Sequence, residues 1–296
     1  MTVVVADAVF DGTNIRQVTN SSHRVNQTTR QATTSGGATV SQVSGITAEE
    51  VTTISSADLA ALIALNTNTF ISAGLGVASG TVTVPYKERS QAAFFASGSN
   101  HNALSGSNCL IVPTSIEASQ DEEQGASCTC DIHWISSDGE TKAATLSTGQ
   151  ALAAQSFNAE FSLGIVDFNG TDVEGVQSVR VVPGITVVKS REKGQPYPVL
   201  VSIQEVAPMI EIVVDDFAEA TPAGGWTAMT AANVYFRKRD DSGLYVSDGT
   251  AEHIKITFAA GLKTVESMEA SDNSNGTTTI TLKGKTLTAS AASAIT

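Results

Sequence analysis

Histidine and cysteine offer the widest chemistry of the residue types in this chain, and both are sparse. The four histidines, His23, His101, His133 and His253, lie far apart in the sequence. His101 sits among hydroxyl and amide side chains in "SNHNALSGS" (99–107), which could hold a base beside a nucleophile. A triad depends on geometry that spacing does not give, and a histidine among turn-forming residues is more often structural. We therefore predict no catalytic residue and no enzyme, and keep a hydrolase based on His101 or His133 as an alternative.

The spacing of the cysteines gives weak evidence for a metal site. Cys128 and Cys130 alternate with Thr129, so both side chains would point to one face of a strand, with His133 nearby. A structural zinc site needs a second pair of ligands, and the sequence has none at a suitable spacing. We predict no metal and no cofactor, and expect Cys109, Cys128 and Cys130 to be buried, reduced thiols. Free thiols indicate synthesis in a reducing cytoplasm.

Acidic residues outnumber basic ones, and they are unevenly distributed. The 296-residue chain has 17 Lys and Arg against 30 Asp and Glu, a net charge of −13. Residues 121–175 hold ten acids and a single base, Lys142, which gives this segment a charge of −9. Such a field repels nucleic acid and argues against a protein that grips DNA. The alternative interpretation is a solvated acidic face that contributes to solubility.

Runs rich in Val, Ile and Thr predict that most of the chain, including the histidines, cysteines and acids described above, is organised by β-strands. Examples are "TVTVPY" (81–86), "SVRVVPGITVV" (178–188), "EHIKITF" (252–258) and "TTTITLKGKTLT" (277–288). Turn signals such as Asn169-Gly170 and Asp248-Gly249 separate such runs at spacings of roughly ten residues. The sequence therefore predicts a mainly β fold, an antiparallel β-sandwich or barrel that forms one domain over 1–296.

The stretch "YPVLVSIQEVAPMIEIVVDD" (197–216) contains two strands whose apolar phase differs. Val199, Val201 and Ile203 occupy odd positions, whereas Ile210, Ile212 and Val214 occupy even ones. Because alternate residues of a strand share a face, the change of phase predicts a bulge, a bend or a change of sheet. Pro208, which has no N–H for a ladder, suits that point.

One short helix is predicted over residues 56–65, in "SSADLAALIAL" (55–65). Ser55 is a suitable N-cap, and Asp58 three residues later completes a capping-box arrangement. Leu59, Leu62 and Ile63 form an apolar stripe, which we expect to lie against a sheet.

Residues 16–45 form a polar, strand-prone segment with few large apolar side chains. Alone, the segment could not bury enough surface to offset the cost of ordering it. We predict an arm or loop that another subunit holds or that stays mobile. The opening "MTVVVADAVF" does not have the pattern of a secretory signal, and no apolar run reaches the ~18 to 20 residues of a membrane span.

Several stretches, read in order, resemble the major tail tube protein of long-tailed, siphovirus-like bacteriophages. The segment 161–216 carries most of the likeness, with Asn169-Gly170-Thr171, Tyr197-Pro198 and "PMIEI" (208–212). The opening "ADAVFDGTNIRQVTNSSHRVNQ" (6–27), the helix in "TTISSADLAALIAL" (52–65) and "VYFRKRDDSGLYVSDGTAEHIKITF" (234–258) are also similar to that family. The likeness is a pattern of strands and turns rather than an active-site signature.

The resemblance implies a structural virion protein that polymerises. Subunits of that family form stacked rings, commonly of six copies, whose inner sheets join into a barrel around a lumen for DNA ejection. The partners implied are further copies of the chain, the tape-measure protein and double-stranded DNA in the lumen, and other tail proteins at the ends. The implied location is the virion tail after synthesis in the host bacterial cytoplasm, with no membrane. Residues 16–45 would be the assembly-dependent arm, and 221–296 closing strands or a small outer extension.

Two groups of charged residues are candidate sites under this interpretation. An acidic lumen wall would repel the phosphates of passing DNA. The candidate lumen acids are Asp121, Glu122, Glu123, Glu160, Asp172 and Glu174. The cluster "FRKRDD" (236–241) is either a solvated hairpin end or an intersubunit ion-pair patch. The candidate intersubunit contacts are Arg237, Lys238, Arg239, Asp240 and Asp241.

Two other classes of non-enzymatic protein share this composition. A head decoration protein or tail ornament would have the same β-rich, Ser- and Thr-rich sequence but no continuous lumen. A carbohydrate-binding adhesin module would usually present several exposed aromatic platforms, and this chain has only Trp134 and Trp226 as tryptophans.

Overall fold

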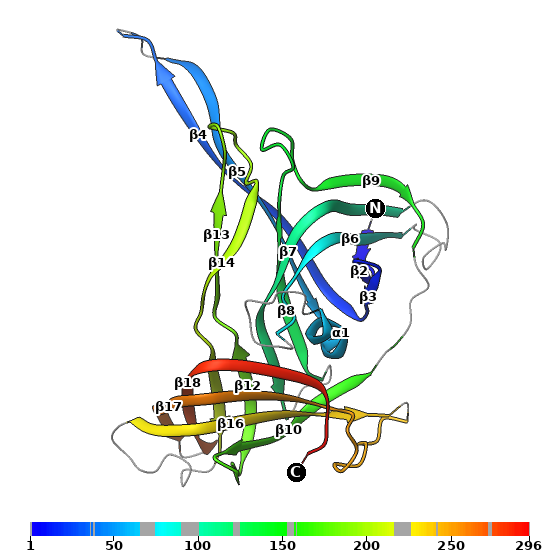
Figure 1. The fold of residues 1–296 in the computed structure, drawn as a ribbon, viewed down its shortest axis with the longest axis vertical. Coiled ribbons are helices and arrows are strands. Elements are labelled where there is room, and N and C mark those ends of the chain that lie inside the picture. The colour runs from blue at the N-terminus through cyan, green and yellow to red at the C-terminus, as the bar shows by residue number, and fades with distance from the viewer. Residues whose placement is uncertain are drawn as a thin grey trace.

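We describe the fold from a computed structural model of the chain. The residues described are 2–35, 37, 39–65, 75–89, 101–120, 125–152, 157, 159–215, 226–240, 242–271 and 274–295. They are almost all β-structure, arranged in antiparallel pairs, so the predicted mainly β fold is confirmed (Figure 1).

Eighteen strands and one short helix are found among the described residues. The strands of the first half are β1 (Thr2–Val5), β2 (Ala8–Phe10), β3 (Thr13–Ile15), β4 (Val18–Thr33), β5 (Val40–Ser56), β6 (Ala78–Arg89), β7 (His101–Ser119), β8 (Ser127–Trp134) and β9 (Thr145–Gln150). Those of the second half are β10 (Glu160–Phe168), β11 (Thr171–Asp172), β12 (Val176–Val182), β13 (Ile185–Ser190), β14 (Leu200–Val206), β15 (Met209–Val214), β16 (Trp226–Arg239), β17 (His253–Ser271) and β18 (Ser274–Ser293). The helix is α1 (Leu59–Ala64).

Strand β7 belongs to two lobes at once. Its first half pairs with β6 on one edge and with β9 on the other, and its second half pairs with β8 and then with β12. We call β1–β9 the N-terminal lobe, which is the upper part of Figure 1. The C-terminal lobe comprises β10–β12 and β15–β18, the lower part of the figure. The sharing of one strand fixes the two lobes to each other through backbone hydrogen bonds.

The C-terminal lobe is a sheet that curls on itself. Its strand order is β11-β10-β16-β17-β18-β15-β12-β7, and β10 returns to contact both β12 and β7. Alternate residues point inward, so that Ile212 lies between Val179 and Ile280 on the neighbouring strands, all three buried. Burying a side chain of this size contributes about 1.5–3 kcal/mol, so layers like this one hold the lobe together. Strands β16–β18, from the 221–296 segment, lie within this sheet.

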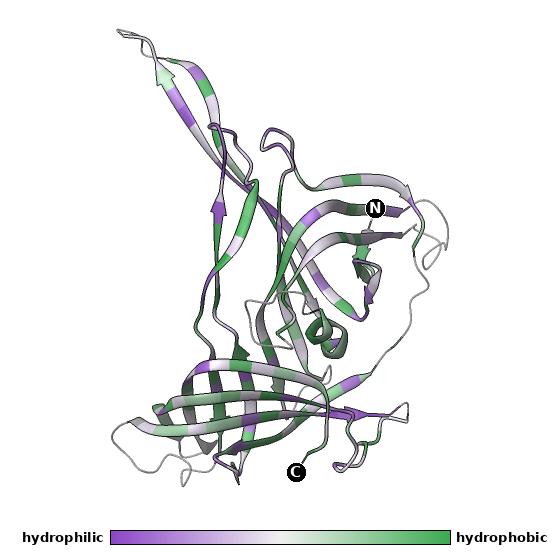
Figure 2. Cartoon of the chain, viewed as in Figure 1, coloured by the Kyte–Doolittle hydropathy of each residue, from purple (hydrophilic) through white to green (hydrophobic). Residues whose placement is uncertain are grey.

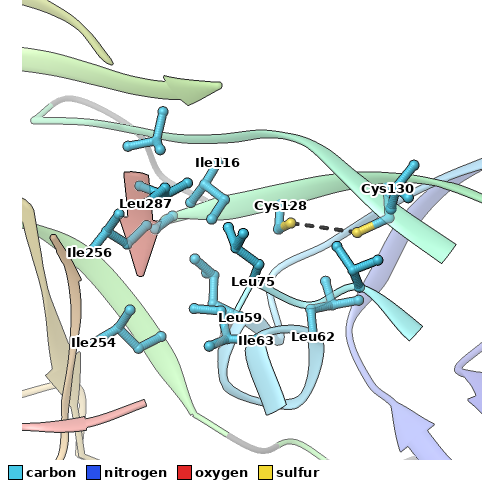
Figure 3. Close-up of a cluster of buried hydrophobic side chains, with 14 of the residues drawn as sticks. Leu59, Leu62, Ile63, Leu75, Ile116, Cys128, Cys130, Ile254, Ile256 and Leu287 are labelled. Carbon is cyan, nitrogen blue, oxygen red and sulfur yellow. Dashed lines mark hydrogen bonds between the residues drawn. The ribbon is translucent and has the colours of Figure 1, made fainter. Parts of the chain in front are cut away.

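Helix α1 packs between the lobes, against β3 and β8 on one side and β18 on the other. Leu59, Leu62 and Ile63 are buried, as the apolar stripe predicts. They join a cluster that draws side chains from both lobes, including Ile116 of β7 and Leu287 of β18 (Figure 3). The helix therefore fills the space that the shared strand leaves between the two sheets.

The predicted N-cap of this helix is wrong, because the cap is Asp58 rather than Ser55. Ser55 and Ser56 belong to β5, where they pair with Thr129 and Cys128, and this ladder keeps them extended. The Asp58 carboxylate accepts the Ala61 N–H, which places the first helical residue at Leu59.

The change of phase in 197–216 is a change of sheet. Of the described strands, β14 pairs with β13 alone, whereas β15 belongs to the C-terminal lobe, and the break falls at Ala207 and Pro208. Gly184 stands opposite, with a positive φ, and a Cβ there would come within 2.0 Å of the Ala207 carbonyl oxygen. This close approach lets the hairpin leave one sheet for another. We call its outer part, β13 and β14, the ribbon, and in Figure 1 it runs upward along the N-terminal lobe.

We expect Asp58→Ala to lower the free energy of unfolding by about 1–2 kcal/mol, as loss of an N-cap does. Asp58 is fully buried, and its carboxylate also accepts the Arg16 N–H at 3.1 Å, so its loss strands two donors. Urea unfolding followed by circular dichroism measures the change. Asp58→Asn, which keeps a side-chain oxygen, is the control and should lose less. Equal stability of Asp58→Ala and the native chain would contradict this account of the cap.

Candidate functional site

The most unusual feature of the surface is a long two-stranded arm. We define the arm as Arg24–Thr33 of β4 and Val40–Thr47 of β5, which project from the N-terminal lobe (Figure 1). Thr28–Thr33 pair with Val40–Thr47, and Arg24–Gln27, at the base, pair with residues 48–51. Strand β5 gains a second partner, β8, only from Val51 onward. Eight consecutive residues of β4, from Arg24 to Gln31, are exposed, so neither face of the arm is covered. Among the described residues, both of its outer edges lack a ladder partner.

The arm has no apolar face that could stabilise it. Cross-strand pairing places Val25 and Val43 on one face among polar side chains, and Arg24 and Arg30 on the other. Figure 2 accordingly shows isolated apolar bands on the arm rather than a continuous stripe. Val43 is 62% exposed, the largest exposure of an apolar side chain on the arm. A two-stranded hairpin is at best marginally stable in water, so the arm is suited to contact another molecule.

The charge of the arm is opposite to that of the chain. Between Asp11 and Glu49 the sequence has three arginines, Arg16, Arg24 and Arg30, and no acidic residue or lysine. The protein as a whole carries −13. A basic arm on an acidic protein is complementary to negatively charged surfaces.

The ribbon holds the base of the arm by ion pairs. The carboxylate of Glu49, in β5, accepts a hydrogen bond from Lys189 Nζ at 3.0 Å and also forms an ion pair with Arg191. Burial by itself would raise the pKa of Glu49, but the hydrogen bonds and positive charges of Lys189 and Arg191 lower it below its usual value. Nearby, the Ala48 N–H donates to the Pro196 carbonyl at 2.9 Å. The arm is therefore anchored at Glu49 and unsupported beyond it.

His133 of β8 lies buried close to these ion pairs. Burial, followed by the positive charge of Lys189, lowers the pKa of His133 to about 4, against the opposing effect of Asp131 and Glu49. Its Nδ1 has no hydrogen-bond partner. A buried imidazole with an unpaired nitrogen stays neutral in the folded protein at physiological pH.

A cleft of about 550 Å³ opens at the base of the arm, where its inner face meets the β6–β7–β9 side of the N-terminal lobe. Apolar and aromatic side chains form much of its wall, with a few polar groups between them. They include Val25, Tyr86, Leu104, Ala144, Leu146 and Tyr197. The size and the lining are typical of binding clefts, including those at the mouths of β-barrels.

The polar groups of the cleft are held by the backbone and by each other. Glu50, only 5% exposed, accepts the N–H groups of Ala143 and Ala144 at 2.8 and 3.0 Å. His23 Nδ1 lies 2.8 Å from Thr52 Oγ1, and partial burial lowers its pKa. These contacts fix the walls of the cleft before anything binds.

Strand β9 forms one rim of the cleft and has a free edge. In the described part of the chain it pairs with β7 alone, through His101, Ala103, Leu104 and Ser105. Its sequence, "TLSTGQ", has no charge and no proline, and Leu146 is 57% exposed. Native sheet edges are usually protected by charges, prolines or bulges. The edge of β9 carries no charge and no proline, but its pairing with β7 shifts register at Thr148 and Gly149, where Gly149 has a positive φ. The regular part of this edge is therefore Thr145–Ser147, which has no further ladder partner among the described residues.

The predicted lumen acids are only partly brought together. Asp121, Glu122 and Glu123 lie outside the described residues. Asp172, in β11, and Glu174, in the turn that follows it, are both exposed. Glu160 stands at the opposite end of β10, facing Arg239 across the strand pair. The three candidates that the structure describes thus occupy two separated positions.

The basic cluster of 237–241 is paired within its own chain. Arg237 Nε donates to Asp248 at 2.9 Å, and Lys238 Nζ lies 2.6 Å from Glu252. Arg239 donates to Ser162 Oγ and to the Tyr245 hydroxyl. Asp240 accepts the Ser242 and Leu244 N–H groups in the following turn, and Asp241 lies outside the described residues. The cluster braces a loop, whether or not the loop also meets another subunit.

The residues with catalytic chemistry are dispersed. His101 lies buried in β7, and the thiols of Cys109, Cys128 and Cys130 are buried and free. Cys128 and Cys130 point to one face, with their sulfurs 3.6 Å apart beneath α1 (Figure 3). Burial raises the pKa of Cys109 to about 12. Over the described ranges, no three His, Cys, Asp or Glu side chains are close enough to hold a metal ion.

Sequence reasoning missed the cleft and the free edge of β9. Tyr86, Leu104 and Leu146 come from three strands, and no local pattern links them. The absence of charge and proline in "TLSTGQ" was the available signal for an unprotected edge. Trp134, a candidate platform for sugars, is buried and donates to Thr52 Oγ1.

Comparison with known proteins does not place the chain in a family. No family model matches it, and no curated protein matches it. Within the described residues, no helix has the length and apolar character needed to cross a membrane.

We expect His133 to make the stability of the protein depend on pH. The folded state keeps His133 neutral down to about pH 4, whereas the unfolded chain binds a proton below about 6.5. The free energy of unfolding should therefore fall as the pH drops from about 6.5 to 4, with His133 contributing roughly 1–3 kcal/mol of the loss. Urea titrations across this range, on the native chain and on His133→Gln, measure that contribution as the difference between two curves. Parallel curves would contradict a neutral, buried His133.

Proposed function

We propose that this protein is the subunit of a bacteriophage tail tube, in which copies form stacked rings around a conduit for DNA. The observation that carries the proposal is the arm, a long hairpin with both faces exposed and with no edge partner among the described strands. A free hairpin of this kind is costly to order and gains little within its own chain. Contact with a neighbouring subunit would supply the missing partners.

The construction of the rest of the chain supports a rigid building block. The C-terminal lobe closes upon itself, α1 fills the joint between the lobes, and the ribbon ties the lobes together on the outside. Such a body would transmit load without changing shape. The arm departs from this body at one end of the long axis of the molecule (Figure 1), where it could reach an adjacent subunit or ring.

The charge of the chain supports a role as a conduit. A tube must let DNA pass without retaining it, and basic walls would bind phosphate through strong, salt-dependent contacts. A net charge of −13 on every subunit gives the assembly a repulsive field for DNA. Asp172 and Glu174, both exposed, are candidates for the lumen surface among the described acids. In this proposal the tape-measure protein and then DNA occupy the lumen, and other tail proteins close the ends.

The proposed function requires geometry rather than reactivity. The proposed location is the virion tail, after synthesis in the cytoplasm of the bacterial host. A decoration protein or an adhesin would share the β-rich construction, but neither needs a subunit that polymerises into hollow tubes. Polymerisation is therefore the property that separates these functions.

Negative-stain electron microscopy of the purified full chain, concentrated to the millimolar range, tests the proposal. We expect hollow tubes or stacked rings of uniform diameter. A protein that remains monomeric under all conditions of salt and concentration would contradict the proposal.

A variant with a shortened arm tests the role of the arm. Replacing residues 28–47 by Asn-Gly joins Gln27 to Ala48, which already face each other, through a two-residue hairpin turn. The anchor at Glu49 and the cleft remain. We expect a folded monomer of unchanged thermal stability that forms no tubes. Tubes of native diameter from this variant would show that the arm is not needed for assembly.

A further inference from the structure

The free edge of β9 and the cleft beside it form a slot for an additional strand. An extended segment that pairs with an open sheet edge can place alternate side chains in an adjoining apolar groove. Here the edge is β9, and the groove presents Leu104, Leu146 and Tyr86. Glu50 and His23, both anchored by hydrogen bonds, hold the far wall in place. The slot is therefore largely formed before a strand enters it.

The arm has the properties that this slot requires. Its β5 strand, Val40–Thr47, has an unpaired outer edge and carries Val40, Val43 and Ile46, all exposed. These residues are uncharged, so no ionised group would be buried on pairing with β9.

Charge complementarity also favours this pairing. The projecting part of the arm carries Arg30 and no acid, whereas Arg24 lies at the base, beside the pairs that Val25 and Asn26 form with Glu50 and Glu49. Asp138 and Glu140 stand on the loop that leads into β9, and Glu50 lines the cleft, against the single base Lys142. Opposite charges on the two surfaces guide them together and oppose pairing between two arms.

The arm that fills the slot must come from a second copy. Within one chain the base of the arm lines the cleft through Val25 and Gln27, while the tip extends away from β9 (Figure 1). Residues 40–47 therefore do not reach the edge of β9 in their own chain. We propose that the outer strand of the arm of one copy adds to β9 of a second copy and lays its apolar side chains over Leu146 and the cleft.

This inference rests on the proposed function, which it deepens by naming the two surfaces that meet. The contact joins two different patches, an arm and a slot, so it is heterologous. Contacts of this type do not saturate in a dimer and produce rings or helical filaments. An arm-to-slot contact thus generates the kind of assembly that a tube requires.

Engineered disulfides test the contact directly. A disulfide forms only where the two Cα atoms come within about 7 Å, and the three native thiols are buried and should not compete. Leu146→Cys is combined in turn with Val40→Cys, Val43→Cys and Ile46→Cys, each in a full chain that assembles under mild oxidation. We expect a ladder of covalent oligomers on a non-reducing gel for at least one of the three pairs.

Leu200→Cys in place of Leu146→Cys is the matched control. Leu200, the first residue of β14 in the ribbon, is 55% exposed, a fraction similar to the 57% of Leu146. It is not part of the slot. We expect no ladder with any of the three arm positions. If the native chain assembles but the pairs with Leu146→Cys give no more ladder than those with Leu200→Cys, the arm-to-slot contact is wrong and the proposed function survives. If the native chain never assembles, both are wrong.

A charge placed on the edge gives a second, independent measure. Leu146→Lys puts an ammonium group at an exposed position, so the monomer should fold normally, but pairing would have to bury that charge. We expect at least a tenfold rise in the concentration at which assembly begins, measured by light scattering. Leu200→Lys should leave that concentration unchanged. Equal assembly of the two variants would overturn the inference.

Discussion

The backbone of β7 must satisfy its hydrogen bonds along both edges, and the architecture depends on how it does so. Residues 103–105 pair with β6 on one edge and β9 on the other, and 116–117 pair with β8 and β12. Along β7, the pairing with β6 stops at Ile111 and the pairing with β12 starts at Ile116. Strand β7 therefore passes from one lobe to the other between these two residues. Pro113, which has no N–H to donate, lies in that interval, where a missing donor disturbs the ladders least. The two lobes are thus one continuous sheet rather than two domains on a linker.

The same requirement explains why the two ends of the molecule differ. In the C-terminal lobe the sheet curls until β10 meets β12 and β7, so little of its edge remains open. In the N-terminal lobe β5 leaves β8 at Val51 and continues into the arm, while β9 stays with β7. The departure of β5 creates the arm, the cleft and the free edge of β9 together. These three features are consequences of a single divergence between strands.

Local patterns predicted the elements that depend on local forces. The change of phase between Ile203 and Ile210 marked the place where the hairpin changes sheets, because side-chain alternation is a property of each strand alone. The apolar stripe of α1 could likewise be predicted from the sequence, but its N-cap could not. Ser55 is a residue type that favours the N-cap position. It remains in β5 instead, because it pairs with Thr129, which lies more than seventy residues further along the chain. Capping preference contributes about 1 kcal/mol and yields to a ladder of several backbone bonds.

The candidate site is formed by pairing between strands far apart in the sequence, so only part of it could be predicted from the sequence. The polar segment 16–45 was recognised as unable to support itself, a judgement that follows from composition. The cleft needed the positions of β4, β7 and β9 relative to one another, which no sequence period encodes. The basic cluster was recognised, but its partners, Asp248 and Glu252, follow it so closely that an internal and an intersubunit role look alike in sequence.

Copies that each carry −13 repel one another, so any contact that assembles them must overcome a long-range penalty with short-range gains. At physiological salt the repulsion between exposed charges is screened beyond about 8 Å, whereas strand pairing and apolar contact act at closer range and are hardly screened. At an uncharged edge such as that of β9, and at the acid-free tip of the arm, strand pairing and apolar contact are opposed by the least charge repulsion. The distribution of charge in this chain therefore discourages random aggregation. In the proposed assembly, an acidic body with an acid-free arm tip would stay dispersed at low concentration and polymerise in a defined direction.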